Sequence, residues 1–149
     1  MKTKIKTSLL TLSFICATTF NALADNDVTI NFNELPIPAQ KTINANFAKS
    51  KVAISKKDVE LFDKSYDVIF TNGDKIEFDA DGVWEKISCK SSSVPKALIP
   101  ATILQYVANH FPEHPIIEIE REKRGFEVEL QNGMELKFDK KGKCIDIDN

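Results

Sequence analysis

The chain repeats one pattern of turns and aromatic residues after an interval of sixty residues, and this repetition limits the folds open to it. Residues 66–82 carry an aromatic-x-Val step, then Asn-Gly, then Phe-Asp-x-x-Gly, and residues 126–142 carry the same features in the same order. A duplicated pattern of this length indicates two copies of one supersecondary unit.

The segments that precede the two patterns also correspond. Residues 36–47 match residues 100–111, and each segment begins at a proline and ends at a phenylalanine. Apolar residues recur between them at helical spacing, and proline is tolerated in the first turn of a helix, where its missing N–H has no partner. We therefore expect one helix at the start of each copy.

These correspondences set the expected domain organisation. The copies span residues 33–90 and 94–149, and the serines at 91–93 link them. Residues 25–32 are expected to form a short N-terminal segment, and residues 1–24 a signal peptide.

Strands are expected after each helix. Apolar and polar residues alternate on both sides of Asn72-Gly73 and of Asn132-Gly133, which is the pattern of a β-hairpin, and the dipeptide favours a type I′ turn. A further Asp-x-x-Gly turn leads into last strands at 83–88 and 143–148. The expected fold class is α+β: a tandem repeat of a helix plus a four-stranded antiparallel meander, with the helices packed on one face of the sheet and the other face open.

The N-terminus has the three parts of a secretory signal. They are the basic residues Lys2, Lys4 and Lys6, an uncharged, mostly apolar stretch over residues 8–20, and the small-x-small site Ala22-Leu23-Ala24. Cleavage after Ala24 predicts a periplasmic or secreted protein, because no stretch has the length of a transmembrane helix. Acylation of Cys16 as a lipoprotein is the alternative, although Ser13-Phe14-Ile15 is a poor lipobox.

The net charge of the chain narrows the classes of partner that it could bind. The whole chain has a formal net charge of −2, and removal of three signal lysines takes the mature chain to −5. Nucleic-acid binders normally carry a basic excess, so no nucleic-acid partner is expected.

Two cysteines remain after signal removal, Cys89 and Cys144. In an exported chain such a pair is a candidate disulfide, and two separate thiols are the alternative.

The order of these motifs resembles the PepSY-like domain family of exported Bacteroides-type proteins, which are also described as beta-lactamase-inhibitor-like. The motifs that carry the resemblance are Tyr66 and Val68, Asn72-Gly73, Phe78-Asp79, and Gly82 with Trp84. The resemblance covers residues 33–149 and implies tandem helix-plus-sheet units, a role in binding or inhibiting another protein, such as a peptidase, and no catalytic residues. The second copy departs from the pattern, with Cys144 where the first has Trp84.

Strict alternation in the last strand of the first copy places Trp84 and Lys86 opposite Ile87, on the open face. Tryptophan is enriched among interface anchors, so Trp84, Lys86 and the out-of-phase Phe62 are the candidate partner-binding residues. Packing of Trp84 on the sheet or between the copies is the alternative.

No metal site or cofactor is expected. Glu77, Asp79 and Asp81 have the spacing of a calcium loop, but Ser88 stands where that loop needs glutamate, and an Asp/Gly-rich turn explains the same residues. His110 and His114 have zinc-ligand spacing, but Pro112 breaks the helix between them.

Acidic residues gather in the second copy, at Glu118, Glu120, Glu122, Glu127 and Glu129. Paired charges on a solvated face explain them, and a docking surface for a basic partner is the sharper interpretation.

The expected function is an exported, non-enzymatic binding module that binds or inhibits an unidentified protein of the envelope or the exterior through the open sheet face. A small-ligand or cation-binding envelope protein is the second hypothesis. An envelope hydrolase ranks third among the hypotheses, because no nucleophile lies in a recognisable sequence motif.

Overall fold

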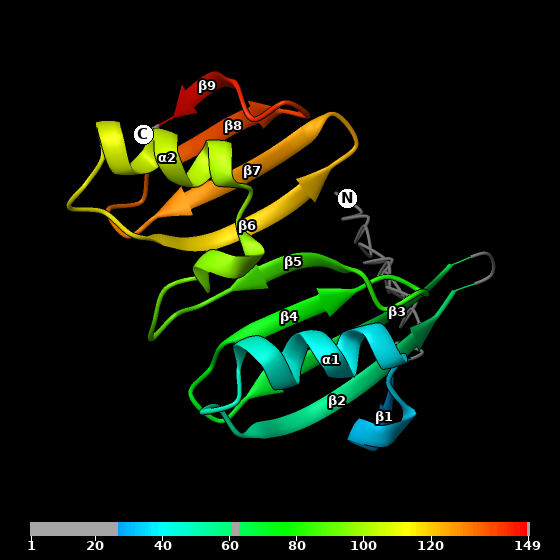
Figure 1. The fold of residues 1–149 in the computed structure, drawn as a ribbon. Helices are drawn as coiled ribbons and strands as arrows, with labels where there is room; N and C mark the ends of the chain where they lie inside the picture. Colours follow the sequence, from blue (N-terminus) through cyan, green and yellow to red (C-terminus); the bar gives the residue numbers. More distant parts are fainter. Residues whose placement is uncertain (1–26, 61–62, 149) are drawn as a thin grey trace, which may run out of the picture.

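The structure is a computed structural model that describes residues 27–60 and 63–148. Within these residues the strands form one antiparallel sheet in which they follow chain order from β1 to β9 (Figure 1). The strands are β1 Val28–Ile30, β2 Val52–Val59, β3 Lys64–Phe70, β4 Lys75–Phe78, β5 Trp84–Ser88, β6 Ile116–Glu122, β7 Gly125–Leu130, β8 Glu135–Asp139 and β9 Cys144–Asp148. The helices are α1 Ile37–Asn46 and α2 Ala101–His110, each preceded by a short 3₁₀ turn, at Phe32–Glu34 and Lys96–Leu98.

This continuous sheet corrects the expected fold class. A tandem repeat of helix plus four-stranded meander is wrong as a description, because β5 and β6 pair antiparallel and join all nine strands. Ile87 and Ile119 face each other across this junction, and neither is exposed at all. Edge strands carry unpaired backbone groups, so pairing β5 with β6 satisfies those groups and buries both isoleucines.

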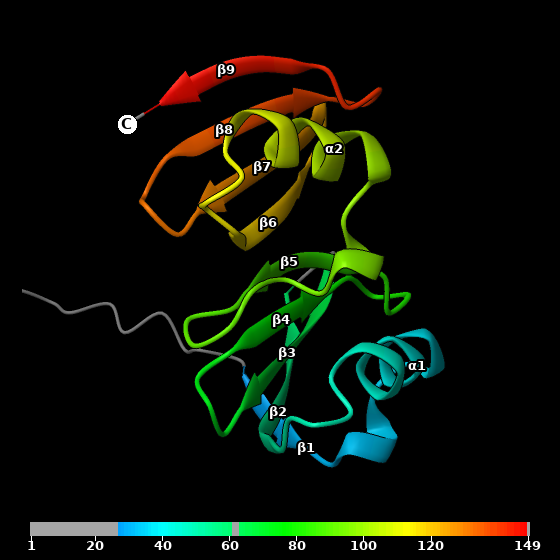
Figure 2. The same cartoon turned by 60° about the vertical axis from the view of Figure 1, so that its left-hand side comes forward.

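One face of the sheet is apolar across almost its whole width. A single row of cross-strand neighbours runs through Ser55, Val68, Ile76, Ile87, Ile119, Val128 and Leu136, and all of them are buried. Figures 1 and 2 show α1 over the strands of the first half and α2 over those of the second. The helices contribute Ala39 and Ile43 from α1, and Ile103 and Val107 from α2, to this core.

The hairpin turns differ from the expected type I′ form. Gly73 and Gly133 have φ of 88° and 86°, but no residue other than glycine has a positive φ in the described part of the chain. Gly73 N–H donates to Phe70 O at 3.0 Å, and Phe70 N–H donates to Asp74 O at 2.9 Å. This is a three-residue loop with glycine in the left-handed position, so one positive φ suffices.

Several sequence-based expectations fall outside the described residues. They are the signal peptide over residues 1–24 with Cys16, and Phe62 in the β2–β3 loop. Among the residues that are described, neither helix has the length and apolar character needed to cross a membrane.

Candidate binding surface

The face of the sheet opposite the helices is covered by charged side chains. One row of cross-strand neighbours on this face runs Lys56, Asp67, Glu77, Lys86, Glu120, Glu127, Lys137 and Asp146. We call this surface, on β2 to β9, the open face. Its side chains alternate with the buried row, as one-sided antiparallel sheets require.

Lys86 lies at the centre of the open face and joins the two halves of the sheet. Its ammonium lies 2.7 Å from Glu118 Oε1 and 2.9 Å from Glu120 Oε2, both on β6. Hydrogen bonds to Glu118 and then Glu120 hold the pKa of Lys86 above its ordinary value. Lys86 is therefore where the prediction placed it, on the open face, but both of its carboxylate partners belong to the protein itself.

The two halves of the open face differ in charge. In the first half, Lys75 lies 2.7 Å from Asp67 and 2.9 Å from Glu77, so acids are neutralised locally. On β6 to β9 the acidic side chains of this face are Glu118, Glu120, Glu122, Glu127, Glu129, Glu135, Asp139, Asp146 and Asp148. Among the described residues of these strands, Lys137 is the basic side chain on this face, 3.6 Å from Glu127. We call this half the acidic half of the open face.

Trp84 is not on the open face, and the prediction that it anchors a partner there is wrong. A bulge between Glu77 and Phe78 sets Trp84 opposite Phe78, whose side chain is fully buried. The bulge adds one residue to β5, so strict alternation fails and Trp84 shares the face of Ile87. Trp84 is buried, and the Arg121 guanidinium covers its ring at 4.0 Å.

Arg121 also lies 5.6 Å from the Phe126 ring, so one guanidinium contacts an aromatic residue from each half of the sheet. Packing of Trp84 at the junction of the two halves is the alternative that the sequence left open. The flat, weakly hydrated guanidinium suits such stacking.

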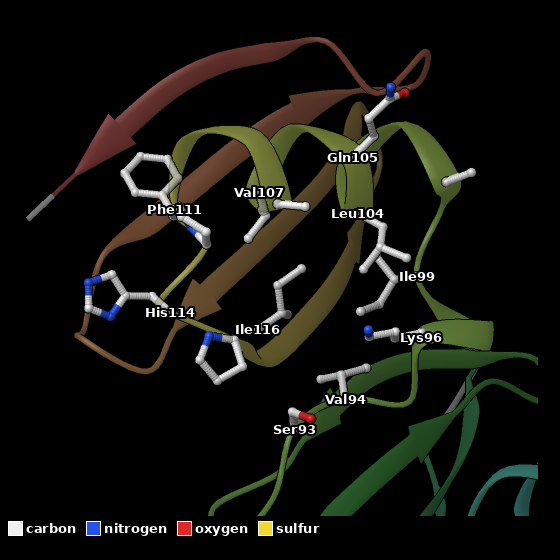
Figure 3. Close-up of a pocket in the computed structure, with 14 residues that line it drawn as sticks. Ser93, Val94, Lys96, Ile99, Leu104, Gln105, Val107, Phe111, His114 and Ile116 are labelled. Atoms are coloured by element: carbon white, nitrogen blue, oxygen red, sulfur yellow. The ribbon is translucent and has the colours of Figure 1, made fainter.

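A groove opens on the helix side, between α2 and the chain that leads into β6 (Figure 3). Its volume is about 490 Å³. The apolar lining includes Val94, Ile99, Leu104, Val107, Phe111 and Ile116, with Lys96 and His114 as polar residues at the groove. Sequence reasoning missed this groove because its walls come from the linker, the helix and a strand, which only the folded chain brings together.

Both cysteines are free thiols in the structure, which is the alternative that the sequence left open to a disulfide between them. Cys89 follows β5 and Cys144 begins β9, with β6, β7 and β8 between those strands. At about 4.8 Å per strand, the lateral distance between β5 and β9 alone is roughly 19 Å, and the two cysteines lie toward opposite ends of these strands. A disulfide requires Cα atoms within about 7 Å.

Each cysteine has its own surroundings. Cys89 is buried near Asp74, and burial raises the pKa of the Cys89 thiol to about 11, with the Asp74 charge adding to the effect. Cys144 lies in a second groove with Tyr106 and His110, and its hydrogen bond with Tyr106 raises the pKa of that phenol. His110 stacks on Tyr106 at 4.2 Å, and its Nδ1 lies 2.9 Å from the Tyr106 carbonyl.

The sequence did not single out Asp74, which is almost fully buried at the β3–β4 turn. Its carboxylate accepts hydrogen bonds from Asn72 Nδ2 at 2.8 Å and Ser92 Oγ at 2.9 Å. These contacts tie the 91–93 linker to the hairpin, so the role they support is structural.

The aspartates of the β4–β5 turn are occupied by backbone contacts. Asp79 Oδ1 accepts from the N–H groups of Asp81 and Val83, each at 2.9 Å, and Asp139 makes the same pair of contacts with Lys141 and Lys143. This is the turn chemistry that the sequence offered as the alternative to calcium. Within the described residues, no three metal-ligating side chains of His, Cys, Asp or Glu lie close enough to hold an ion.

Comparison with known proteins gives a family match for the chain. Its residues 64–146 match the family model described as proposed beta-lactamase-inhibitor-like, PepSY-like. No curated protein matches the chain.

Solved structures from Bacteroides match more than four fifths of the chain. A proposed periplasmic protein from Bacteroides vulgatus is 51% identical, with a TM-score of 0.81, over 85% of this chain and 99% of that one. A proposed calcium-regulated periplasmic protein from Bacteroides thetaiotaomicron is 49% identical, with a TM-score of 0.82 over the same shares. A second proposed periplasmic protein from Bacteroides vulgatus is 37% identical, with a TM-score of 0.77, over 83% and 99%. On the family match and these identities, the chain belongs to the PepSY-like family.

Proposed function

We propose that this chain is an exported, non-enzymatic protein that binds a basic protein partner through the acidic half of the open face. The observation that carries the proposal is the charge of that half. Its carboxylates stand side by side across four strands, with Glu118, Glu129, Glu135 and Asp148 in one cross-strand row.

Lys86 pairs with Glu118 at the inner end of this row, at 2.7 Å, and the rest of the row is costly unless something neutralises it. Like charges directly opposite each other on adjacent strands destabilise a sheet. A partner with lysine or arginine side chains at its surface would relieve that repulsion and gain from complementary charge, which steers encounter and selects the partner. The inhibitor-like description of the family supports a binding role.

Charge reversal on the acidic half tests this proposal. The mature chain is used to capture proteins from an envelope extract of its own host, in parallel with the double variant Glu129→Lys, Glu135→Lys. The matched control is Glu60→Lys, Glu113→Lys, which makes the same charge change at exposed positions outside the acidic half.

We expect one partner to be retained by the wild type and the control, lost by the double variant, and released as salt rises. Equal retention by both double variants would overturn the proposal, as would a partner whose binding is indifferent to salt.

Export to the periplasm is part of the same proposal. The signal at residues 1–24 and the periplasmic descriptions of the relatives support it. Mass spectrometry of the protein purified from a periplasmic fraction should give a chain that begins at Asp25; a chain that retains residues 1–24 would contradict it.

A small apolar ligand is the second candidate, favoured by the groove beside α2. Its apolar walls and volume of about 490 Å³ are typical of ligand pockets, which bury most of a small molecule. Lys96 and His114 at the groove favour a ligand with a carboxylate. A medium-chain fatty acid should raise the melting temperature of the wild type and not of Leu104→Trp, which fills the groove; no shift in the wild type would exclude this class.

The relative described as calcium-regulated motivates one further arm of that thermal assay. Calcium chloride is compared with magnesium and sodium chloride at matched ionic strength. A rise specific to calcium would support the cation-binding version of the alternative, and equal responses would count against it.

A further inference from the structure

The outer edge of β9 has an unoccupied pairing side. β9 is the last strand in the sheet order, so one side pairs with β8 and no described strand lies on the other (Figure 2). Two large apolar side chains on this strand are exposed, Ile145 at 61% and Ile147 at 44%. Exposed apolar residues on an edge strand are a template for further pairing.

β5 supplies an internal template for what would cover this edge. Ile87 on β5 lies opposite Ile76 on β4, and Ile147 on β9 lies opposite Leu136 on β8 in the same way. Ile87 is fully buried because β6 continues the sheet and sets Ile119 beside it. Ile147 lacks that next strand and is 44% exposed, so an added strand would cover part of its side chain.

The backbone at the edge is also ready for a strand. At β5, the chain beyond the strand is bonded into β6, with Cys89 N–H donating to Ile117 O at 2.7 Å. At β9, Ile147 N–H donates instead to the side chain of its neighbour, Asp146 Oδ1, at 3.1 Å. An incoming carbonyl would replace this local contact and free the carboxylate for a cation.

Charge decides which strand fits. In the β5·β6 pair, Lys86 lies opposite Glu120, with Ile87 against Ile119 beside it. In β9 the residues on either side of Ile147 are Asp146 and Asp148. The charge beside the isoleucine is therefore negative in β9, whereas Lys86 makes it positive in β5. A second copy of β9 would set carboxylates opposite carboxylates, which is unfavourable.

We propose that the outer edge of β9 binds an extended segment of another protein as a tenth, antiparallel strand, with the sequence basic–apolar–basic opposite Asp146, Ile147 and Asp148. Main-chain hydrogen bonds supply affinity and the alternating side chains supply specificity in this mode of recognition. The proposal goes beyond binding at the acidic half. It shares Asp146 and Asp148 with that surface, but it concerns the backbone edge of β9 rather than the face of the sheet.

Peptides test the proposal directly on the mature chain. The probe is the blocked peptide Thr-Thr-Lys-Ile-Lys-Thr-Thr, followed by amide chemical shifts in NMR. The controls are the same peptide with Glu-Ile-Glu at its centre and a permuted peptide with Lys-Lys-Ile, which has the same charge in a different order. A fourth peptide carries an N-methyl group on the central isoleucine and so loses that backbone donor.

We expect the probe to shift the amides of residues 145–148, and each control to bind at least about tenfold more weakly, since each removes a charge match, a register or a hydrogen bond. The double variant Asp146→Lys, Asp148→Lys should prefer the Glu-Ile-Glu peptide, whereas Glu129→Lys, Glu135→Lys should still bind the probe at this edge.

Equal binding of the permuted or N-methylated peptide would overturn the proposal, because attraction of charge without strand pairing would then be the cause. Shifts confined to β6 and β7 would overturn it as well, and would place the peptide on the acidic half. Circular dichroism of each variant separates lost binding from lost folding.

Discussion

At the scale of single residues, the position that stands out is Ser55 on β2. Its side chain is buried in the apolar row, and its hydroxyl has no hydrogen-bond partner among the described residues. Burying an unpartnered hydroxyl costs about 1–3 kcal/mol.

Replacing Ser55 with alanine should therefore stabilise the protein, by about 1 kcal/mol after the small loss of packing. Thermal unfolding measures this as a higher melting temperature. The exposed Ser93→Ala serves as control and should change little. A lower melting temperature for Ser55→Ala would mean that the hydroxyl is bonded in solution.

The two thiols should differ in reactivity because Cys89 is buried and Cys144 is partly exposed. Burial raises the pKa of Cys89 to about 11, so at pH 8 its thiolate fraction is on the order of one in a thousand, and the nucleophile is the thiolate. We expect iodoacetamide at pH 8 to modify the partly exposed Cys144 in the native protein and Cys89 only after unfolding.

Mass spectrometry of the native and the denatured protein counts the adducts, and Cys144→Ser identifies the site. Rapid labelling of Cys89 in the native protein would contradict the burial seen here, and no labelling even in denaturant would indicate a disulfide after all.

At the scale of elements, the first helix is held by the turn between β4 and β5. Gly82 at this turn has φ of 81°, and a Cβ atom there would lie 2.6 Å from Pro36 Cβ and 3.0 Å from Ala39 N. The helix start and the turn are thus packed so closely that a methyl group does not fit.

Gly82→Ala should therefore destabilise the protein by more than Gly73→Ala. Gly73 has a similar φ of 88° with nothing within 4 Å of the added atom, so its variant reports the conformational cost alone, about 1 kcal/mol. Denaturant unfolding of both variants gives the difference, which is the cost of displacing α1. Equal losses would show that helix and turn separate freely.

At the scale of the whole molecule, the junction of β5 and β6 makes one cooperative body of the two halves. Ile119 lies in this junction, fully buried beside Ile87. Truncating such a residue to alanine typically costs about 2–5 kcal/mol.

We expect Ile119→Ala to lower the melting temperature of a single transition, because small domains that share one core unfold together. Calorimetry checks this by comparing the calorimetric and van't Hoff enthalpies. Two separate transitions, in the wild type or in the variant, would show that each half folds on its own.

The amino-acid sequence by itself determined the local structure. The proline-led helices, the glycine turns and the alternation of β3 and β7 depend on neighbours in the chain, and local pattern predicts them well. The sequence also placed Lys86 on the open face and gathered the acids that form most of its acidic half.

Only the tertiary structure decided how these pieces meet. The β5–β6 pairing, the bulge that turns Trp84 toward the helices, the wide separation of Cys89 from Cys144 and the groove beside α2 each depend on residues far apart in the chain. The alternation of apolar and polar residues does not reveal where a bulge inserts an extra residue. One such residue moves every later side chain to the other face of the sheet. The exposed edge at β9 follows from the same cause, because a strand becomes an edge only when the whole sheet has been assembled.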